Sequence, residues 1–92
     1  MLVSMKKMDE AIAVLDQAIK RNGQDEQSYL ERARLYFKMG KMEKSLADYT
    51  KVLEIMPTSK VYTERSQVYM KMGKAELARQ DMEKSRRSLD EL

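Results

Sequence analysis

The sequence contains neither cysteine nor histidine, and these two absences exclude several kinds of chemistry. Without cysteine the chain has no disulfide, no thiol nucleophile and no zinc–thiolate site. Without histidine it lacks the side chain most often used as a general base near neutral pH. The sequence also has no glycine-rich phosphate loop, nucleophile elbow or metal-ligand spacing. We therefore expect a protein that is not an enzyme and that binds no cofactor or metal.

Proline and glycine are also scarce, with one and three residues among 92, while 42% of the residues are hydrophobic and 36% are charged. This composition is typical of amphipathic helices rather than of a disordered chain. The net charge of +3 comes from interleaved basic and acidic residues, so no contiguous basic stripe favours nucleic acid. No apolar run approaches the ~18 residues of a membrane span or suits a signal peptide. We expect a cytoplasmic protein that binds neither nucleic acid nor membrane.

The tetrapeptide Lys-Met-Gly-Lys occurs twice, at residues 38–41 and 71–74. Around it, residues 29–51 and 62–84 are identical at 11 of 23 positions, which is far above chance. A fainter copy lies upstream, where residues 5–19 align with the corresponding part of the first unit. A regular repeat of this length indicates a solenoid of stacked units.

Each unit is predicted to be a pair of helices, because apolar and small residues recur at helical spacing on both sides of the tetrapeptide. Gly40 and Gly73 are expected to end the first helix of each pair, since glycine adopts the left-handed conformation without a Cβ penalty. The predicted helices cover residues 7–21, 25–39, 42–55, 60–72 and 75–90.

The period and the residue pattern resemble the tetratricopeptide repeat (TPR) family. The matching positions are Tyr29, Arg32, Ala33, Tyr36, Ser45, Tyr49 and Pro57 in one unit and Tyr62, Arg65, Ser66, Tyr69, Ala78 and Met82 in the next. The two arginines depart from the pattern, because they occupy the family's usual leucine position. The resemblance implies an all-α, right-handed solenoid of antiparallel helical hairpins, with about two and a half repeats and about five helices in a single domain.

The resemblance divides this domain, residues 1–92, into a partial repeat at 1–24, a full repeat at 25–58 and a final repeat at 59–92 with a C-terminal capping helix. A partial repeat is expected to leave the apolar face of the first helix partly uncovered. Either a longer array of repeats or a second copy of the chain would cover that face. In the second case, self-association would depend on apolar residues such as Leu2, Ile12 and Leu15.

Two arginine–aspartate pairs, Arg32 with Asp48 and Arg65 with Asp81, recur in register with one member on each helix of a hairpin. These residues could either recognise a partner or form a partly buried ion pair within each repeat, and the pattern favours the ion pair. The nine methionines lie mostly at helix ends and inter-repeat seams, which favours core filling over a binding face. Met70 is the exception, because its helical position faces away from the paired helix.

The first helix of each pair has a face opposite its packing residues, and TPR proteins use this face to line a concave peptide-binding groove. The resemblance places there Gln27, Leu30, Arg34, Phe37, Lys38, Lys60, Thr63, Gln67, Met70 and Lys71. This mixture suits a partner polypeptide with an apolar anchor and acidic residues. Glu31 and Glu64 stand where TPR domains that clamp the acidic tails of chaperones carry Asn and Arg, so we do not expect a carboxylate clamp.

The predicted function is a non-catalytic protein-interaction module or scaffold, which binds a partner polypeptide through the concave groove. The alternative is an assembly or spacer segment of a longer TPR solenoid, which acts by self-association as a homodimer or other homo-oligomer rather than by peptide binding.

Overall fold

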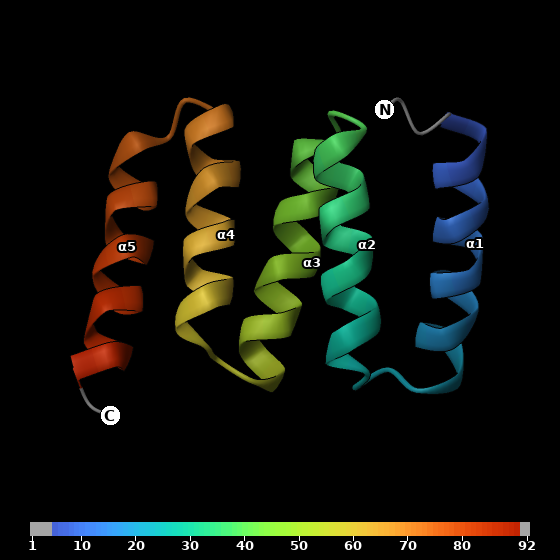
Figure 1. Ribbon diagram of the computed structural model, residues 1–92, viewed down its shortest axis with the longest axis horizontal. Coiled ribbons are helices and arrows are strands. Elements are labelled where there is room, and N and C mark those ends of the chain that lie inside the picture. Colours follow the sequence, from blue (N-terminus) through green and yellow to red (C-terminus); the bar gives the residue numbers. More distant parts are fainter. Residues whose placement is uncertain (1–4, 91–92) are drawn as a thin grey trace.

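The computed structural model describes residues 5–90, with side chains described as far as Arg87, and Leu2 therefore lies outside the described residues. The helices are α1 (Met5–Arg21), α2 (Glu26–Lys38), α3 (Met42–Ile55), α4 (Ser59–Lys71) and α5 (Ala75–Asp90). They stand side by side in chain order, and consecutive helices run antiparallel (Figure 1). The described residues contain no strand. This architecture confirms the expected all-α solenoid of helical hairpins.

The starts of α2 and α4 are fixed by side-chain caps. A carboxylate oxygen of Asp25 accepts a hydrogen bond from the backbone N–H of Ser28 at 3.3 Å, and the hydroxyl of Thr58 accepts one from Val61 at 3.2 Å. Such caps satisfy N–H groups that have no partner in the first turn. Asp25 therefore precedes α2, which begins one residue later than expected, and α4 begins one residue earlier.

The repeated tetrapeptide forms the same tight turn in both hairpins. Gly40 has a φ of 77° and Gly73 a φ of 75°, both in the left-handed region. The N–H of Gly40 donates to the carbonyl of Phe37 at 3.1 Å, and that of Lys41 donates to the carbonyl of Tyr36 at 2.9 Å. This is a Schellman motif, which glycine accommodates without strain. Because it closes the helix early, α2 and α4 each end one residue before the predicted position.

α1 begins at Met5, two residues earlier than expected. In the repeat register its first residues correspond to the turn around Gly40, and Lys6 stands in the position of that glycine. A non-glycine residue in the left-handed conformation costs about 1–2 kcal/mol. The segment therefore continues as helix instead of turning.

The main core lies where α2, α3 and α4 meet. Its buried members are Ala33, Tyr49, Val52, Leu53, Val61 and Val68. The partly buried side chains that pack around it are Tyr29, Leu30, Phe37, Met42, Leu46, Tyr62 and Met72. α3 supplies three of the six buried members, so this helix joins the two hairpins into one body.

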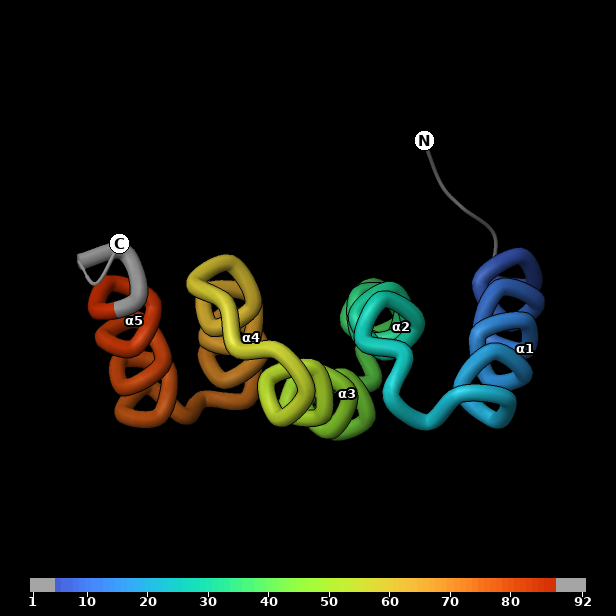
Figure 2. The backbone as a smooth tube through the Cα atoms, turned by 90° about the horizontal axis from the view of Figure 1, so that it is seen from below, coloured from blue at the N-terminus to red at the C-terminus, as the bar shows by residue number. Residues whose placement is uncertain are grey.

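α1 and α5 lie at opposite ends of the row (Figure 2), and of the two α1 packs less extensively against its neighbour. The buried residues of α1 are Met8 and Ile12 only, and α1 packs against α2 less extensively than α3 does. Val14 is 68% exposed. The apolar face of α1 is therefore partly uncovered, as the register of a partial repeat leads one to expect.

The methionines divide between core and surface. Met42 and Met72 pack against the core, and Met70 is 61% exposed, as predicted for each. Core filling is wrong, however, for three methionines that are about half-exposed, namely Met5, Met56 and Met82. They lie in the first turn of α1, just after α3 and on α5.

Candidate functional site

Each hairpin contains a buried arginine–aspartate pair. Arg32 on α2 donates two hydrogen bonds of 2.8 Å to the carboxylate of Asp48 on α3. Arg65 on α4 makes the same bidentate contact with Asp81 on α5, at 2.8 and 2.7 Å. The two aspartates are only 5% and 1% exposed. These contacts confirm the ion-pair interpretation, and they leave neither aspartate available to a partner.

Both arginines lie against tyrosines of their own helix. The guanidinium carbon of Arg32 lies 5.6 Å from the ring centre of Tyr29 and 5.8 Å from that of Tyr36. Arg65 is placed in the same way between its two tyrosine neighbours, at 5.9 and 5.5 Å. The hydrogen bond to Asp48 raises the pKa of Arg32 above its ordinary value, although burial opposes this shift. A charged side chain is stable at the family's usual leucine position because it has both a counter-ion and aromatic walls.

A third ion pair joins the two hairpins. Arg34 on α2 donates two hydrogen bonds of 2.8 Å to the carboxylate of Glu64 on α4, which also accepts one of 3.0 Å from the hydroxyl of Tyr49. The bonds from Arg34 hold the pKa of Glu64 below its usual range, against the effect of burial. Burial and the charge of Glu64 raise the pKa of Tyr49, so its hydroxyl stays protonated and donates. Arg34, Glu64 and Tyr49 thus form one hydrogen-bonded group at the contact between the hairpins.

Two hollows flank this ion pair on the face between α2 and α4. The first, of about 300 Å³, is lined by Gln27, Leu30, Arg34 and Lys60 together with Glu26, Val52, Met56, Thr58 and Val61. The second, of about 410 Å³, is lined by Phe37, Gln67, Met70 and Lys71. We call this surface, two hollows separated by the Arg34–Glu64 pair, the central groove. In the view of Figure 2, α2 and α4 lie on one side of the row and α3 lies on the other.

Eight of the ten predicted site residues thus line the central groove, and two lie elsewhere. The hydroxyl of Thr63 donates to the carbonyl of Ser59 at 3.1 Å and lies 2.9 Å from the hydroxyl of Ser85 on α5. It therefore faces the interior of its own hairpin. Lys38 is exposed and lines a separate hollow between α1 and α2.

The sequence did not single out Val61 and Met56 as groove residues. Val61 is a core residue by its helical spacing, yet it also lines the first hollow. Met56 lies in the connection between α3 and α4, and no periodicity assigns a face to such a position. Their apolar side chains make the first hollow less polar than the sequence alone predicted.

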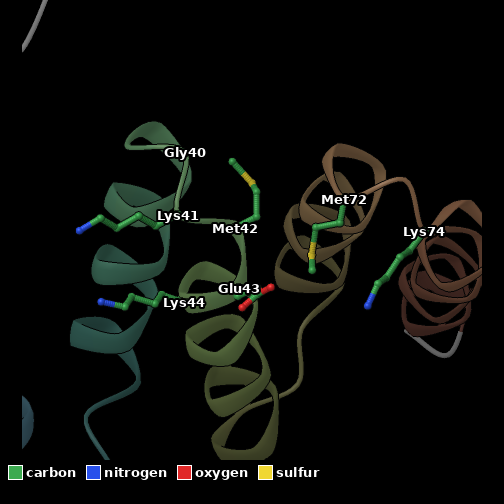
Figure 3. A pocket seen from close by; sticks show the side chains of 7 residues that line it. All are labelled: Gly40, Lys41, Met42, Glu43, Lys44, Met72 and Lys74. Atoms are coloured by element: carbon green, nitrogen blue, oxygen red, sulfur yellow. The ribbon is translucent and has the colours of Figure 1, made fainter.

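A further hollow lies at the ends of the two hairpin turns and is shown in Figure 3. It is lined by Gly40, Lys41, Met42, Glu43, Lys44, Met72 and Lys74. Lys41 and Lys44 extend away from Lys74 in this view, and Glu43 lies between them (Figure 3). The positive charges therefore do not converge on one point, as an anion site requires.

Two further properties of the described residues limit the kinds of site. They contain no group of three or more Asp, Glu, His or Cys side chains placed to hold a metal ion. Among residues 5–90, no helix has both the length and the apolar character needed to cross a bilayer. The central groove is therefore the candidate functional site.

Acid is expected to weaken the contact between the hairpins through Glu64. Its pKa is lower in the folded protein than its usual value of 4.5, so this carboxylate stabilises the fold above that value. The stabilisation is lost as the pH falls through the folded pKa. Urea unfolding at several pH values between about 6 and 3 should show a shallower pH dependence for Glu64→Gln than for wild type.

A matched control is Glu76→Gln, because Glu76 is exposed and pairs with the equally exposed Arg79, three residues later on α5, at 2.6 Å. This variant should retain the pH dependence of the wild type, since exposed pairs contribute little. Equal pH dependence in wild type and Glu64→Gln would contradict the role assigned to Glu64.

Comparisons with known proteins agree with the fold of stacked helical hairpins. Family models described as tetratricopeptide repeat match residues 27–59 in one case and residues 1–25 and 59–85 in the other. The Hsp70-Hsp90 organizing protein 1 of Glycine max is 40% identical over 57 residues, and the Hsp70-Hsp90 organizing protein of Triticum aestivum is 39% identical over 57 residues. Each alignment covers 62% of this chain but 10% of the relative. The chain thus spans about a tenth of the length of these curated relatives.

The solved structure titled "Crystal structure of MamA" superposes with a TM-score of 0.89 at 23% sequence identity. The superposition covers 92% of this chain and 50% of that one, and at this identity it shows a shared fold alone. The family models match most of the chain, and the hairpins, turns and period agree with them. The protein therefore belongs to the tetratricopeptide repeat family.

Proposed function

We propose that the protein is a non-catalytic interaction module that holds an extended segment of a partner polypeptide in the central groove. Membership of a family of protein-interaction repeats supports this proposal. The observation that carries it is the pair of hollows on either side of the Arg34–Glu64 ion pair. Each hollow combines an apolar wall with an exposed lysine, Lys60 in the first and Lys71 in the second.

The spacing of the hollows defines the kind of segment that fits. Leu30 and Phe37, one in each hollow, are seven residues apart on α2, which corresponds to about 10 Å along the helix axis. An extended peptide in the polyproline II conformation covers this distance in about three residues, and because this conformation has three residues per turn, its side chains at i and i+3 point to the same side. The preferred segment therefore carries two apolar side chains three positions apart, and an acidic side chain beyond each of them to face Lys60 and Lys71.

The middle of the groove argues against recognition of a free carboxyl terminus. Arg34 already has a carboxylate partner in Glu64, at 2.8 Å. Glu31 is exposed on the same helix and would repel a second carboxylate. The curated relatives are named as organizing proteins of Hsp70 and Hsp90, but the Asn and Arg of a carboxylate clamp are Glu31 and Glu64 here. An internal segment of the partner suits this surface better than a chain end.

A set of labelled peptides tests this proposal directly. Each peptide carries two leucines between acidic residues, with the leucines two, three or four positions apart, and binding is measured by fluorescence anisotropy. We expect the spacing of three to bind best. The Met70→Ala/Lys71→Glu variant should bind that peptide about thirtyfold more weakly, which corresponds to about 2 kcal/mol.

The matched control is Leu77→Ala/Arg87→Glu, which makes the same kinds of change at exposed positions on α5, outside the central groove. It should bind the peptide as the wild type does. An unchanged affinity for the Met70→Ala/Lys71→Glu variant would reject the groove as the binding surface. An amidated and a free peptide C-terminus should bind alike, since no carboxylate clamp is involved.

A further inference from the structure

A second surface lies between α1 and α2 and shares Arg34 with the central groove. Here a hollow of about 480 Å³ is lined by Ala11, Val14, Leu15, Glu31, Arg34, Leu35 and Lys38. Its floor is apolar, and its two charged ends, Glu31 and Lys38, are both exposed. An apolar floor of this kind, with a valine that is 68% exposed beside it, is a feature of interaction surfaces.

The other repeats show that this face is normally covered. In the repeat register Ala11, Val14 and Leu15 correspond to Ser45, Asp48 and Tyr49 on α3. Those three residues are only 0%, 5% and 3% exposed, because α2 and its neighbours pack over them. The same surface on α1 has no covering helix among the described residues.

Two substitutions distinguish this face of α1 from the corresponding faces of α3 and α5. Lys6 replaces the turn glycine, so the tight Schellman turn that folds α2 onto α3 is disfavoured before α1. Val14 replaces Asp48, so this face of α1 has no carboxylate for an arginine like Arg32 and is apolar at that point. The face of α1 therefore suits an apolar partner surface.

The charges around the hollow fit a second copy of this chain. α1 and α2 run antiparallel, and Asp16 pairs with Arg32 at 2.8 Å, so Val14 lies at the level of Arg34. That level is midway between Glu31 and Lys38, which are seven residues apart on one face of α2. A two-fold axis near Val14 would therefore bring Glu31 of one copy opposite Lys38 of the other, twice in each dimer.

We propose that the apolar face of α1 and the adjoining hollow form an isologous dimer interface between two copies of this chain. Val14 of each copy inserts between α1 and α2 of the other, where Ala11 allows close approach. The Glu31 and Lys38 side chains form the polar rim and fix the antiparallel orientation. Apart from Arg34, the hollow at this interface shares no lining residue with the two hollows of the central groove.

Sedimentation analysis over about a thousandfold range of concentration tests the dimer, because its population follows mass action. We expect wild type to be dimeric at the upper end of the range. Val14→Glu should raise the dissociation constant at least about a hundredfold, because it places two carboxylates near the axis in an apolar contact. Ala13→Glu, at an exposed position adjacent on α1 that does not line the hollow, should dimerise as wild type does.

A charge exchange then identifies the partner as a second copy. Glu31→Lys and Lys38→Glu should each weaken the dimer about threefold to tenfold, since like charges then meet twice across the axis. The double variant should restore the wild-type affinity. Wild type that stays monomeric throughout the range, or a double variant no tighter than either single variant, would overturn the proposal. Binding of a foreign helical peptide to monomeric wild type, lost in Val14→Glu, would also overturn it in favour of a different partner.

Discussion

Replacement of Asp81 by asparagine is expected to lower the free energy of unfolding by about 3 kcal/mol. Asp81 is 1% exposed and accepts two hydrogen bonds from Arg65, at 2.8 and 2.7 Å. The amide keeps the size of the side chain but leaves a largely buried guanidinium without its counter-ion. An amide oxygen also accepts only one of the two bonds, and its NH₂ group would face a donor. Urea unfolding followed by far-UV circular dichroism measures this loss.

The matched comparison is Asp48→Asn in the preceding hairpin. Arg32 would there retain a second carboxylate, that of Asp16, at 2.8 Å. Its side chain is also more exposed than that of Arg65, at 19% against 12%. The loss should therefore be about half as large as for Asp81→Asn. Equal losses for the two variants would contradict this account, because they would show that the retained carboxylate has no effect.

A double replacement separates the net contribution of the ion pair to stability from the cost of leaving one buried charge unpaired. Arg65→Met with Asp81→Leu exchanges a buried ion pair for two apolar side chains of similar volume. Such exchanges are often neutral, because the Coulomb attraction of a buried pair is offset by its desolvation. We expect the double variant to lose much less stability than Asp81→Asn alone. A larger loss would indicate that the pair itself stabilises the hairpin strongly.

The features that the sequence predicted correctly are those set by the repeat register. Arg32 and Asp48 recur 33 residues later as Arg65 and Asp81, so one spacing observed twice was enough to pair them. The turn at Gly40 was also predictable, because the left-handed conformation that ends a helix depends only on the backbone of the glycine itself. The φ of 77° confirms this conformation. Local periodicity also places helix ends within two residues, because caps and turns are local.

The contacts that the sequence did not predict join different repeats. Arg34 reaches Glu64 across 30 positions, and Arg34 has no arginine counterpart in the last repeat, where Gln67 occupies its position. Such a contact depends on the angle at which neighbouring hairpins stack, which helical periodicity does not contain. Thr63 shows the same limit, because its hydroxyl turns to Ser85 on α5. The spacing of residues in the sequence predicts which side chains share a face of a helix. Which neighbouring helix that face contacts depends on how the hairpins stack.

Replacement of Tyr49 by alanine is expected to lower the free energy of unfolding by about 4 kcal/mol. Tyr49 is 3% exposed and belongs to the core where α2, α3 and α4 meet. Its hydroxyl also donates to Glu64 at 3.0 Å. Alanine would leave a cavity at the seam between the two hairpins and remove one of the bonds that join them. Tyr49→Phe removes only the hydroxyl, and we expect a loss of about 1 kcal/mol.

The Tyr49 variants also test how the two hairpins are coupled. In a solenoid the total stability is approximately the sum of each repeat and of the interfaces between neighbours. Because α3 supplies half of the buried core, damage at Tyr49 should uncouple α4 and α5 from the preceding helices. Urea unfolding of Tyr49→Ala should then become less cooperative, with a smaller m-value, while Tyr49→Phe keeps the wild-type slope. Hydrogen exchange should show earlier opening in α4 and α5 than in α2 and α3. An unchanged slope with uniform exchange would contradict this role of Tyr49, because the remaining core members Val52, Leu53, Val61 and Val68 would then be enough to couple the hairpins.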